Sequence, residues 1–172
     1  MDAGFAIAAA ALAAAGALMA GEAVLSAHNE RQLRARGAVE PAGDVYAAMR
    51  WAYPACFAAM AAEGAVVGPA PETALAAGLI GFALAKSLKL TAISALGARW
   101  SFRVLVVPGA PLVTRGPYRV FRHPNYIAVA GEIVSFALIV AAPVTGPLGL
   151  LGFGWLMRRR IAVEDRALGR EP

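Results

Sequence analysis

The stretch YIAVAGEIVSFALIVAAPVTGPLGLLGFGWLM, residues 126–157, decides the fold of this chain. Two apolar runs, 126–142 and 144–157, stand on either side of the break APVTGP. Proline and glycine at this spacing end one helix and allow the chain to turn before the next begins. The sequence therefore predicts a helical hairpin close to the C-terminus.

Three further apolar runs precede the hairpin, at residues 5–25, 45–67 and about 72–96. A membrane-spanning helix needs roughly 20 apolar residues, so we expect about five spans. The chain is 59% hydrophobic and 16% charged, with a mean hydropathy of +0.61, whereas soluble domains average about 45–50% apolar and about 25% charged residues. These values predict an all-α fold, a polytopic transmembrane helical bundle that forms one domain over residues 1–172.

The N-terminal run lacks the basic leader of a signal peptide, because only Asp2 carries a charge before residue 5. We therefore interpret residues 5–25 as a retained span. Arginines are abundant in loops 28–50 and 97–125 and in the C-terminal tail, and lysine and arginine are absent from the loops between them. Five spans place every basic loop on one side, as the positive-inside rule requires. We expect a bacterial inner-membrane protein, with its N-terminus outside and its C-terminus and site cytoplasmic.

Several charged residues fall inside the expected spans. Lys86 and Lys89 occupy the second half of run 72–96, where we expect their stems to extend to the membrane interface. Unpaired charges in a bilayer are costly. Glu132, in the fourth span, has two interpretations: a polar residue that lines a substrate or cofactor cavity, or a hydrogen-bond partner of Lys86 that ties helices together.

Polar residues crowd at both open ends of the predicted hairpin. RGPYRVFRHPNY, residues 115–126, precedes its first helix, and RRRIAVEDRAL, residues 158–168, ends its second. A hairpin brings these ends together. Arg160 and Glu164 share one helix face, and Pro124 suits a first helical turn, where free N–H groups attract anions. The sequence predicts a pocket at the membrane surface that holds a histidine, arginines and carboxylates.

The residues alone leave two interpretations of this cluster open. Arginines beside apolar spans anchor helices at lipid headgroups, which suits Arg158 and Arg159. His123 is not needed for anchoring and favours a small-molecule site. Nucleic acid is not an expected partner, because the basic residues flank apolar spans. The single cysteine, Cys56, excludes an internal disulfide and a cysteine-based zinc site, and no metal site is expected.

The motif LVTRGPYRVFRHPNY, residues 112–126, followed by RRRIAVEDRAL, resembles the C-terminal core of the isoprenylcysteine carboxyl methyltransferase family, which is related to phospholipid methyltransferases. The family pattern is approximately L-V-x-x-G-x-Y-x-x-x-R-H-P-x-Y, a helical hairpin, and R-x-x-x-E-E-x-x-L. NERQLRARGAVE, residues 29–40, also resembles the first cytoplasmic loop of bacterial members. This chain has Asp165 in place of the second glutamate. Many relatives continue with an aromatic-rich tail, so we expect a more open site here, or a different lid.

The resemblance implies S-adenosyl-L-methionine as the cofactor, bound at the cytoplasmic face by a core over about residues 97–168. It implies cofactor contacts at Ala110, Pro111, Leu112, Val113, Tyr118, His123, Pro124, Asn125, Tyr126 and Glu164. Arg160 corresponds to the substrate-facing arginine of the family, and Arg160 and His123 are the expected catalytic residues. Glu132 is predicted to contact substrate.

Methyl transfer is an in-line displacement that depends on positioning and desolvation. A carboxylate acceptor would need only an orienting cation, for which Arg160 would form a bidentate clamp. A phenol, with a pKa of about 10, would need a base such as His123 or Glu164. The expected partners are membrane lipids and a lipid-like acceptor: an isoprenylcysteine-type carboxylate or hydroxyl, a long-chain phenol such as an alkylresorcinol or alkylpyrone, or a phospholipid amine. A non-catalytic small transporter is disfavoured, because the polar groups pool at one face.

Overall fold

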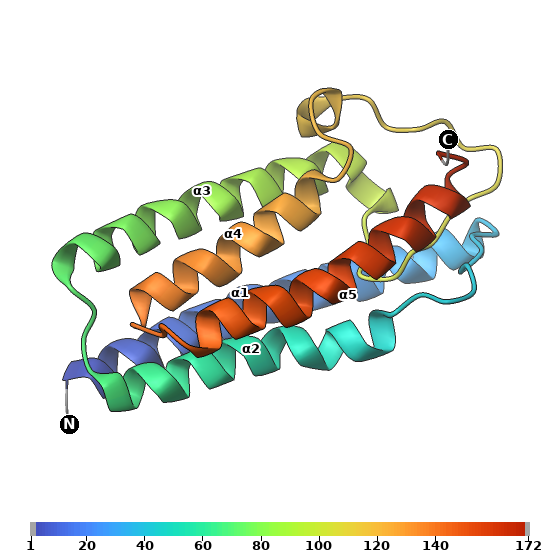
Figure 1. The fold of residues 1–172 in the computed structure, drawn as a ribbon. Helices are drawn as coiled ribbons and strands as arrows, with labels where there is room; N and C mark the ends of the chain where they lie inside the picture. Colours follow the sequence, from blue (N-terminus) through green and yellow to red (C-terminus); the bar gives the residue numbers. More distant parts are fainter. Residues whose placement is uncertain (1–2, 171–172) are drawn as a thin grey trace.

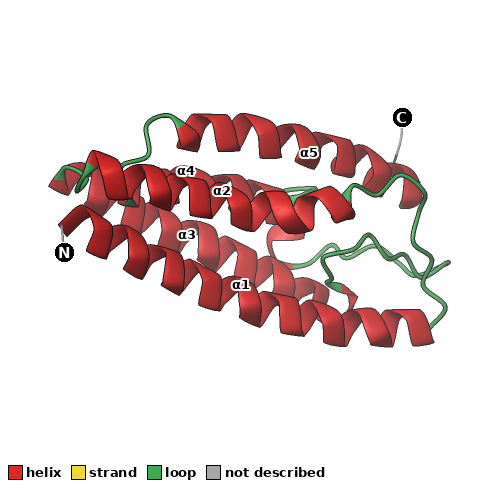
Figure 2. Cartoon of the chain, turned by 90° about the horizontal axis from the view of Figure 1, so that it is seen from below, coloured by secondary structure: helices red, strands yellow, loops and turns green. Residues whose placement is uncertain are grey.

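The computed structural model describes residues 3–170, which form five α-helices that run side by side (Figures 1 and 2). The helices are α1 (Ala3–Ala35), α2 (Tyr46–Val67), α3 (Glu72–Leu96), α4 (Pro124–Ile139) and α5 (Thr145–Ala167). Two short 3-10 helices, η1 (Gly97–Arg99) and η2 (Gly116–Arg119), lie in the connection from α3 to α4. The predicted all-α bundle is confirmed. The described residues contain no strand, and a single bridge pairs Val39 with Val106.

The predicted C-terminal hairpin is present as α4 and α5. α4 ends at Ile139, three residues earlier than predicted, because the chain already turns at Val140 and Ala141, the latter with φ of 55°. The turn is held by the last part of α2. The Glu63 carboxylate accepts hydrogen bonds from the backbone N–H groups of Val144 at 3.0 Å and Thr145 at 2.7 Å. A carboxylate at this position satisfies N–H groups that a helix start leaves free.

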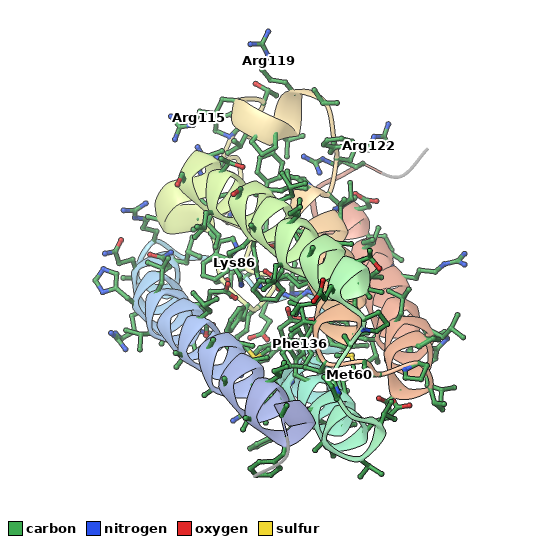
Figure 3. All side chains as sticks on the ribbon, turned by 90° about the vertical axis from the view of Figure 1, so that its left-hand side faces the viewer. Met60, Lys86, Arg115, Arg119, Arg122 and Phe136 are labelled. Carbon is green, nitrogen blue, oxygen red and sulfur yellow. The ribbon has the colours of Figure 1, made fainter. Side chains whose placement is uncertain are left out.

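The short turns and the long connections between helices lie at opposite ends of the bundle (Figure 1). The start of α1, the α2–α3 turn and the α4–α5 turn lie at one end. The long connections 36–45 and 97–123 lie at the other, together with the C-terminal end of α5. We call this second end the basic end, because it carries all the arginine-rich loops. Figure 3 shows Arg115 and Arg119 of this end pointing away from the helices.

Small residues and an aromatic core hold the helices together. A Cβ atom added to Gly78 of α3 would lie 2.8 Å from the carbonyl oxygen of Ser135 in α4, so the two backbones touch. Small residues allow this close approach of membrane helices. Phe57 of α2 packs on Phe136 of α4 with ring centroids 4.6 Å apart, beside the buried Met60; Figure 3 shows Met60 and Phe136 inside the bundle.

The outer surface of the bundle is apolar. Val24, Val66, Leu84 and Leu151 have exposed fractions of 72%, 87%, 66% and 72%. A soluble surface rarely carries so many exposed apolar side chains, whereas a bilayer covers them. α1 and the segment Glu72–Arg99 are each long and apolar enough to cross a membrane, and the apolar helix α4 is shorter.

Candidate active site

A cavity of about 550 Å³ opens at the basic end of the bundle. This volume falls within the range of about 300–1,000 Å³ that is usual for small-molecule sites. Its walls come from α1, α2, the second half of α3, the start of α4, α5 and the connection between α3 and α4. Apolar side chains such as Met19, Val129 and Phe153 line it together with a small number of charged groups.

His123 stands at the start of α4 and faces the end of α5. It occupies the N-cap position, and Pro124 follows as the first helical residue, as the fixed φ of proline favours. The imidazole Nε2 atom lies 3.1 Å from Oδ1 of Asp165, and Nδ1 lies 3.8 Å from Oε2 of Glu164. The two ends of the hairpin therefore meet at the cavity.

Tyr126 links Arg160 to Glu164. Its hydroxyl donates a hydrogen bond to Oε2 of Glu164 at 2.9 Å and accepts one from Nε of Arg160 at 3.0 Å. Tyr126 lies in the first turn of α4, and Arg160 and Glu164 lie on one face of α5. The hydroxyl thus fixes the distance between a cation and a carboxylate, both of which line the cavity.

Arg160 is held on its remaining sides by the long connections. Arg160 is only 6% exposed, and its Nη2 atom donates a hydrogen bond to the carbonyl oxygen of Phe102. Nη1 lies 3.7 Å from Oδ1 of Asp44. The Asp44 carboxylate also accepts the backbone N–H groups of Tyr46 and Val104, each at 3.1 Å. This arrangement fixes the plane of the guanidinium and places a negative charge beside it.

The segment 110–113 and Tyr118 form another wall of the cavity. Nη1 of Arg99 donates to the carbonyl oxygen of Pro111 at 2.5 Å and holds this segment in place. Burial, with a smaller effect of the Glu164 charge, raises the pKa of the Tyr118 phenol above its ordinary value, so Tyr118 is a neutral donor or acceptor. Oδ1 of Asn125 is buried and has no hydrogen-bond partner among residues 3–170.

Most of the predicted site residues line this one cavity: Ala110, Pro111, Leu112, Val113, Tyr118, His123, Asn125, Tyr126, Arg160 and Glu164. Pro124 does not line it, because it is buried as the first residue of α4. Glu132 also does not line it. Its carboxylate contacts the ammonium groups of Lys86 at 2.7 Å and Lys89 at 3.1 Å, which is the helix tie considered above.

The prediction that the side chains of Lys86 and Lys89 extend to the membrane interface is wrong. Lys86 and Lys89 point inward, as Figure 3 shows for Lys86, and their side chains are 12% and 3% exposed. They pair with Glu22 of α1 as well as with Glu132. Charge balance among intramembrane residues is the signal that points to these pairs, because each buried ammonium needs a buried carboxylate.

Sequence reasoning also missed Asp44. It lies in a loop far from the motifs, and no spacing connects it with Arg160. The one available signal is its position two residues before α2, where aspartate commonly accepts backbone N–H groups.

Comparisons with known proteins identify the family of this chain. The model of the isoprenylcysteine carboxyl methyltransferase (ICMT) family matches residues 76–170, which contain both ends of the hairpin. The chain belongs to this family. It is also 32% identical, over 87% of its length and 89% of the relative's, to the uncharacterized protein YpbQ of Bacillus subtilis (strain 168). No solved structure gives a significant match.

As a member of the ICMT family, the chain is a membrane methyltransferase. Its site combines the buried Arg160, a histidine that is hydrogen-bonded to an aspartate, and a glutamate that is hydrogen-bonded to a tyrosine. Such a set can orient an oxygen nucleophile, accept a proton and hold a cationic group.

Proposed function

We propose that this protein transfers a methyl group from S-adenosyl-L-methionine to an oxygen atom of a lipid-like acceptor, at the cytoplasmic face of a bacterial inner membrane. The observation that carries the proposal is the meeting of His123, Tyr126, Arg160 and Glu164 around one cavity whose other walls are apolar. A polar donor and an apolar acceptor need such a mixed site.

The lining groups fit the donor. S-adenosylmethionine carries an ammonium, a carboxylate, ribose hydroxyls and an adenine amine. Glu164 would accept the ammonium or the ribose, and Arg122 and Arg170, which also line the cavity, would balance the carboxylate. The buried Oδ1 of Asn125 has no partner within the described part of the chain, and an N–H group of the donor would satisfy it.

The residues of the chain supply orientation and proton transfer. When bound, S-adenosylmethionine supplies an electrophilic methyl group on its sulfonium. Arg160, fixed by Tyr126 and the carbonyl of Phe102, presents a preorganised positive charge to the acceptor oxygen. If Nε2–H of His123 donates to Asp165, Nδ1 is free to accept a proton. The apolar walls exclude water from the reacting atoms.

The contacts of Arg160 and His123 favour a hydroxyl acceptor over a carboxylate. Arg160 already donates to Tyr126 and Phe102 and lies 3.7 Å from Oδ1 of Asp44, so its fork is largely occupied. A bidentate clamp for a carboxylate would have to displace these partners. His123, bonded to Asp165, offers the base that a phenol or enol requires. Long-chain phenols such as alkylresorcinols, and alkylpyrones, are the acceptors that this geometry supports best.

The proposal is tested by titrating S-adenosylmethionine into the detergent-solubilised protein in a calorimeter. We expect micromolar binding that Glu164→Ala and Asn125→Ala weaken at least about tenfold, the effect of a lost charge-assisted hydrogen bond. Arg159→Ala is the matched control, since Arg159 is exposed on the same helix and stacks on Trp155. A well-folded sample that does not bind the donor would refute the proposal and favour a transporter or scaffold.

A further inference from the structure

Four charged side chains form a closed ring inside the bundle, which we call the ion-pair ring. Nζ of Lys86 lies 2.8 Å from Glu22 and 2.7 Å from Glu132. Nζ of Lys89 lies 2.6 Å from Glu22 and 3.1 Å from Glu132. The hydroxyl of Tyr53 donates to Glu132 as well. The ring therefore joins α1, α3 and α4 at one level of the bundle, and Tyr53 adds a contact from α2.

Stability alone is a weak reason for this ring. The side chains of Glu132 and Lys89 are 1% and 3% exposed, so their desolvation is nearly complete. Replacing a buried ion pair by well-packed apolar residues is often neutral or stabilising. Ionisable residues inside a membrane usually serve a binding or transport site.

Half of the ring faces the cavity and half does not. Glu22, Lys89 and Tyr53 line the cavity, while Lys86 and Glu132 lie behind them. Tyr53 follows Met49, which contacts Arg160, by four residues of α2, a rise of about 6 Å. The cavity thus continues from Arg160 to the ring, roughly one turn deeper in the bundle.

The charges of the ring decide what it can bind. Two ammonium and two carboxylate groups sum to no net charge, so an added anion or cation would be left unbalanced in a medium of low dielectric constant. An uncharged oxygen function fits better, because it can accept a hydrogen bond from Lys89 and, as a hydroxyl, donate one to Glu22.

We propose that Glu22, Lys89 and Tyr53 form a second polar subsite, which binds an uncharged hydroxyl or carbonyl oxygen of the acceptor, deeper in the bundle than the oxygen that is methylated. The subsite makes the enzyme select amphiphiles with two oxygen functions over those with one. This inference rests on the proposed function for the identity of the occupant as a methyl acceptor.

The ring supplies matched variants for the test. Lys89→Met removes a cavity-facing ammonium, and Lys86→Met removes its counterpart, which contacts the same two carboxylates but lies outside the cavity. The probes are a long-chain alkylresorcinol and the alkylphenol of the same chain length. Their only difference is a second ring hydroxyl, roughly one helical turn from the first. The equilibrium dissociation constants of both probes are measured in detergent.

We expect wild type to bind the alkylresorcinol about tenfold more tightly than the alkylphenol, the effect of one net hydrogen bond. Lys89→Met removes this preference and Lys86→Met keeps it. Equal binding of the two probes by wild type, including no binding of either, overturns the subsite. An equal loss of the preference for the alkylresorcinol in both lysine variants also overturns it. Glu22→Gln and Glu132→Gln form a second pair with the same expectation if a lysine variant does not fold.

A separate readout distinguishes this inference from the proposed function. S-adenosylmethionine binding is measured by calorimetry on the same samples, and we expect it to be unchanged in both lysine variants. If no sample binds the donor while the probe preference follows the variants, the subsite stands and the methyltransferase proposal fails. If the donor binds and the preference is absent, the proposed function stands and the subsite fails.

Discussion

At the scale of single residues, Arg160 is the side chain on which most of the site converges. It contacts Tyr126 of α4, the carbonyl of Phe102 and the carboxylate of Asp44, so one guanidinium sets the positions of a helix and of both long connections. A planar fork with five donors can do this, and an ammonium cannot.

Arg160→Lys is therefore expected to reduce methyl transfer by roughly a hundredfold, in the range found when one oriented donor is removed from an active site. The measurement is the transfer of a tritiated methyl group from S-adenosylmethionine to an extractable lipid acceptor. Arg159→Lys on the exposed face of α5 is the control and should retain wild-type turnover. Full activity of Arg160→Lys would show that the fork geometry is not used.

Tyr126→Phe tests the link between the arginine and the glutamate. The change removes the hydroxyl that donates to Glu164 at 2.9 Å and accepts from Arg160 at 3.0 Å, and it leaves both charged groups short of one partner. We expect donor affinity to fall about tenfold, with a loss of stability of about 1–3 kcal/mol. Calorimetry with S-adenosylmethionine and a thermal unfolding curve give the two values. Unchanged values in both experiments would contradict the link.

Residue chemistry also explains which parts of the site can be predicted from the sequence. His123, Tyr126, Arg160 and Glu164 occupy fixed spacings at the two open ends of one hairpin, so a local pattern places them together. Asp44 and the ring residue Glu22 reach the cavity only through tertiary packing. No spacing encodes those contacts, because the partners lie on elements whose relative rotation is set by the whole bundle.

At the scale of elements, the helices follow the apolar runs closely where proline and glycine bound them. α2 and α3 begin and end within one residue of the predicted spans. α1 continues to Ala35, ten residues beyond its apolar run, because its last turns are polar but remain helical outside the expected membrane region. Hydropathy measures what a bilayer can cover and does not mark where a helix ends.

The α3–α4 contact depends on glycine. A Cβ at Gly78 would lie 2.8 Å from the carbonyl oxygen of Ser135, so Gly78→Ala must push the two helices apart, and we expect a loss of about 1–3 kcal/mol. Gly16→Ala is the control, because no atom lies within 4 Å of a Cβ at that position. Unfolding in mixed detergent micelles measures both variants. Equal stability of the two would show that the contact is looser than described.

The long connection 36–45 is held in place by ion pairs of Glu40, and their contribution to stability depends on pH. Glu40 accepts hydrogen bonds from Arg34 at 2.7 Å and from Arg103 at 2.6 Å. Burial raises the pKa of the Glu40 carboxyl, but the two arginines outweigh this effect, so its pKa lies below the usual value. The carboxyl is more acidic in the folded state, so its contribution is present above its unfolded pKa of about 4.3 and is lost as the pH falls through its folded pKa.

Glu40→Gln is thus expected to lower the unfolding temperature slightly at neutral pH and to make no difference at a pH well below 4, where the wild-type carboxyl is protonated. Because the three side chains are partly exposed, salt should reduce the effect. Thermal unfolding from neutral to acid pH gives the comparison. A difference between the variants that persists in acid would assign the effect to packing and not to charge.

At the scale of the whole molecule, the separation of charge between the two ends predicts the orientation of the bundle in the membrane. The basic end carries the long connections and the cavity, and the opposite end carries the short turns. Retention of positive loops in the cytoplasm, as the positive-inside rule predicts, would place the cavity where the proposed water-soluble donor is made, and would leave the apolar outer surface in the bilayer. The distribution of arginines thus predicts the side from which the proposed donor enters the cavity.

Cysteine labelling of intact cells tests this orientation. With Cys56 replaced by alanine, Arg119→Cys introduces an exposed thiol at the basic end, and Pro69→Cys introduces one in the α2–α3 turn at the opposite end. A membrane-impermeant maleimide, added after permeabilising any outer membrane, should label position 69 and not position 119, whereas both should react after detergent lysis. The reverse pattern would place the cavity on the outer face, where S-adenosylmethionine has no supply, and the methyl donor would then have to be reconsidered before the acceptor.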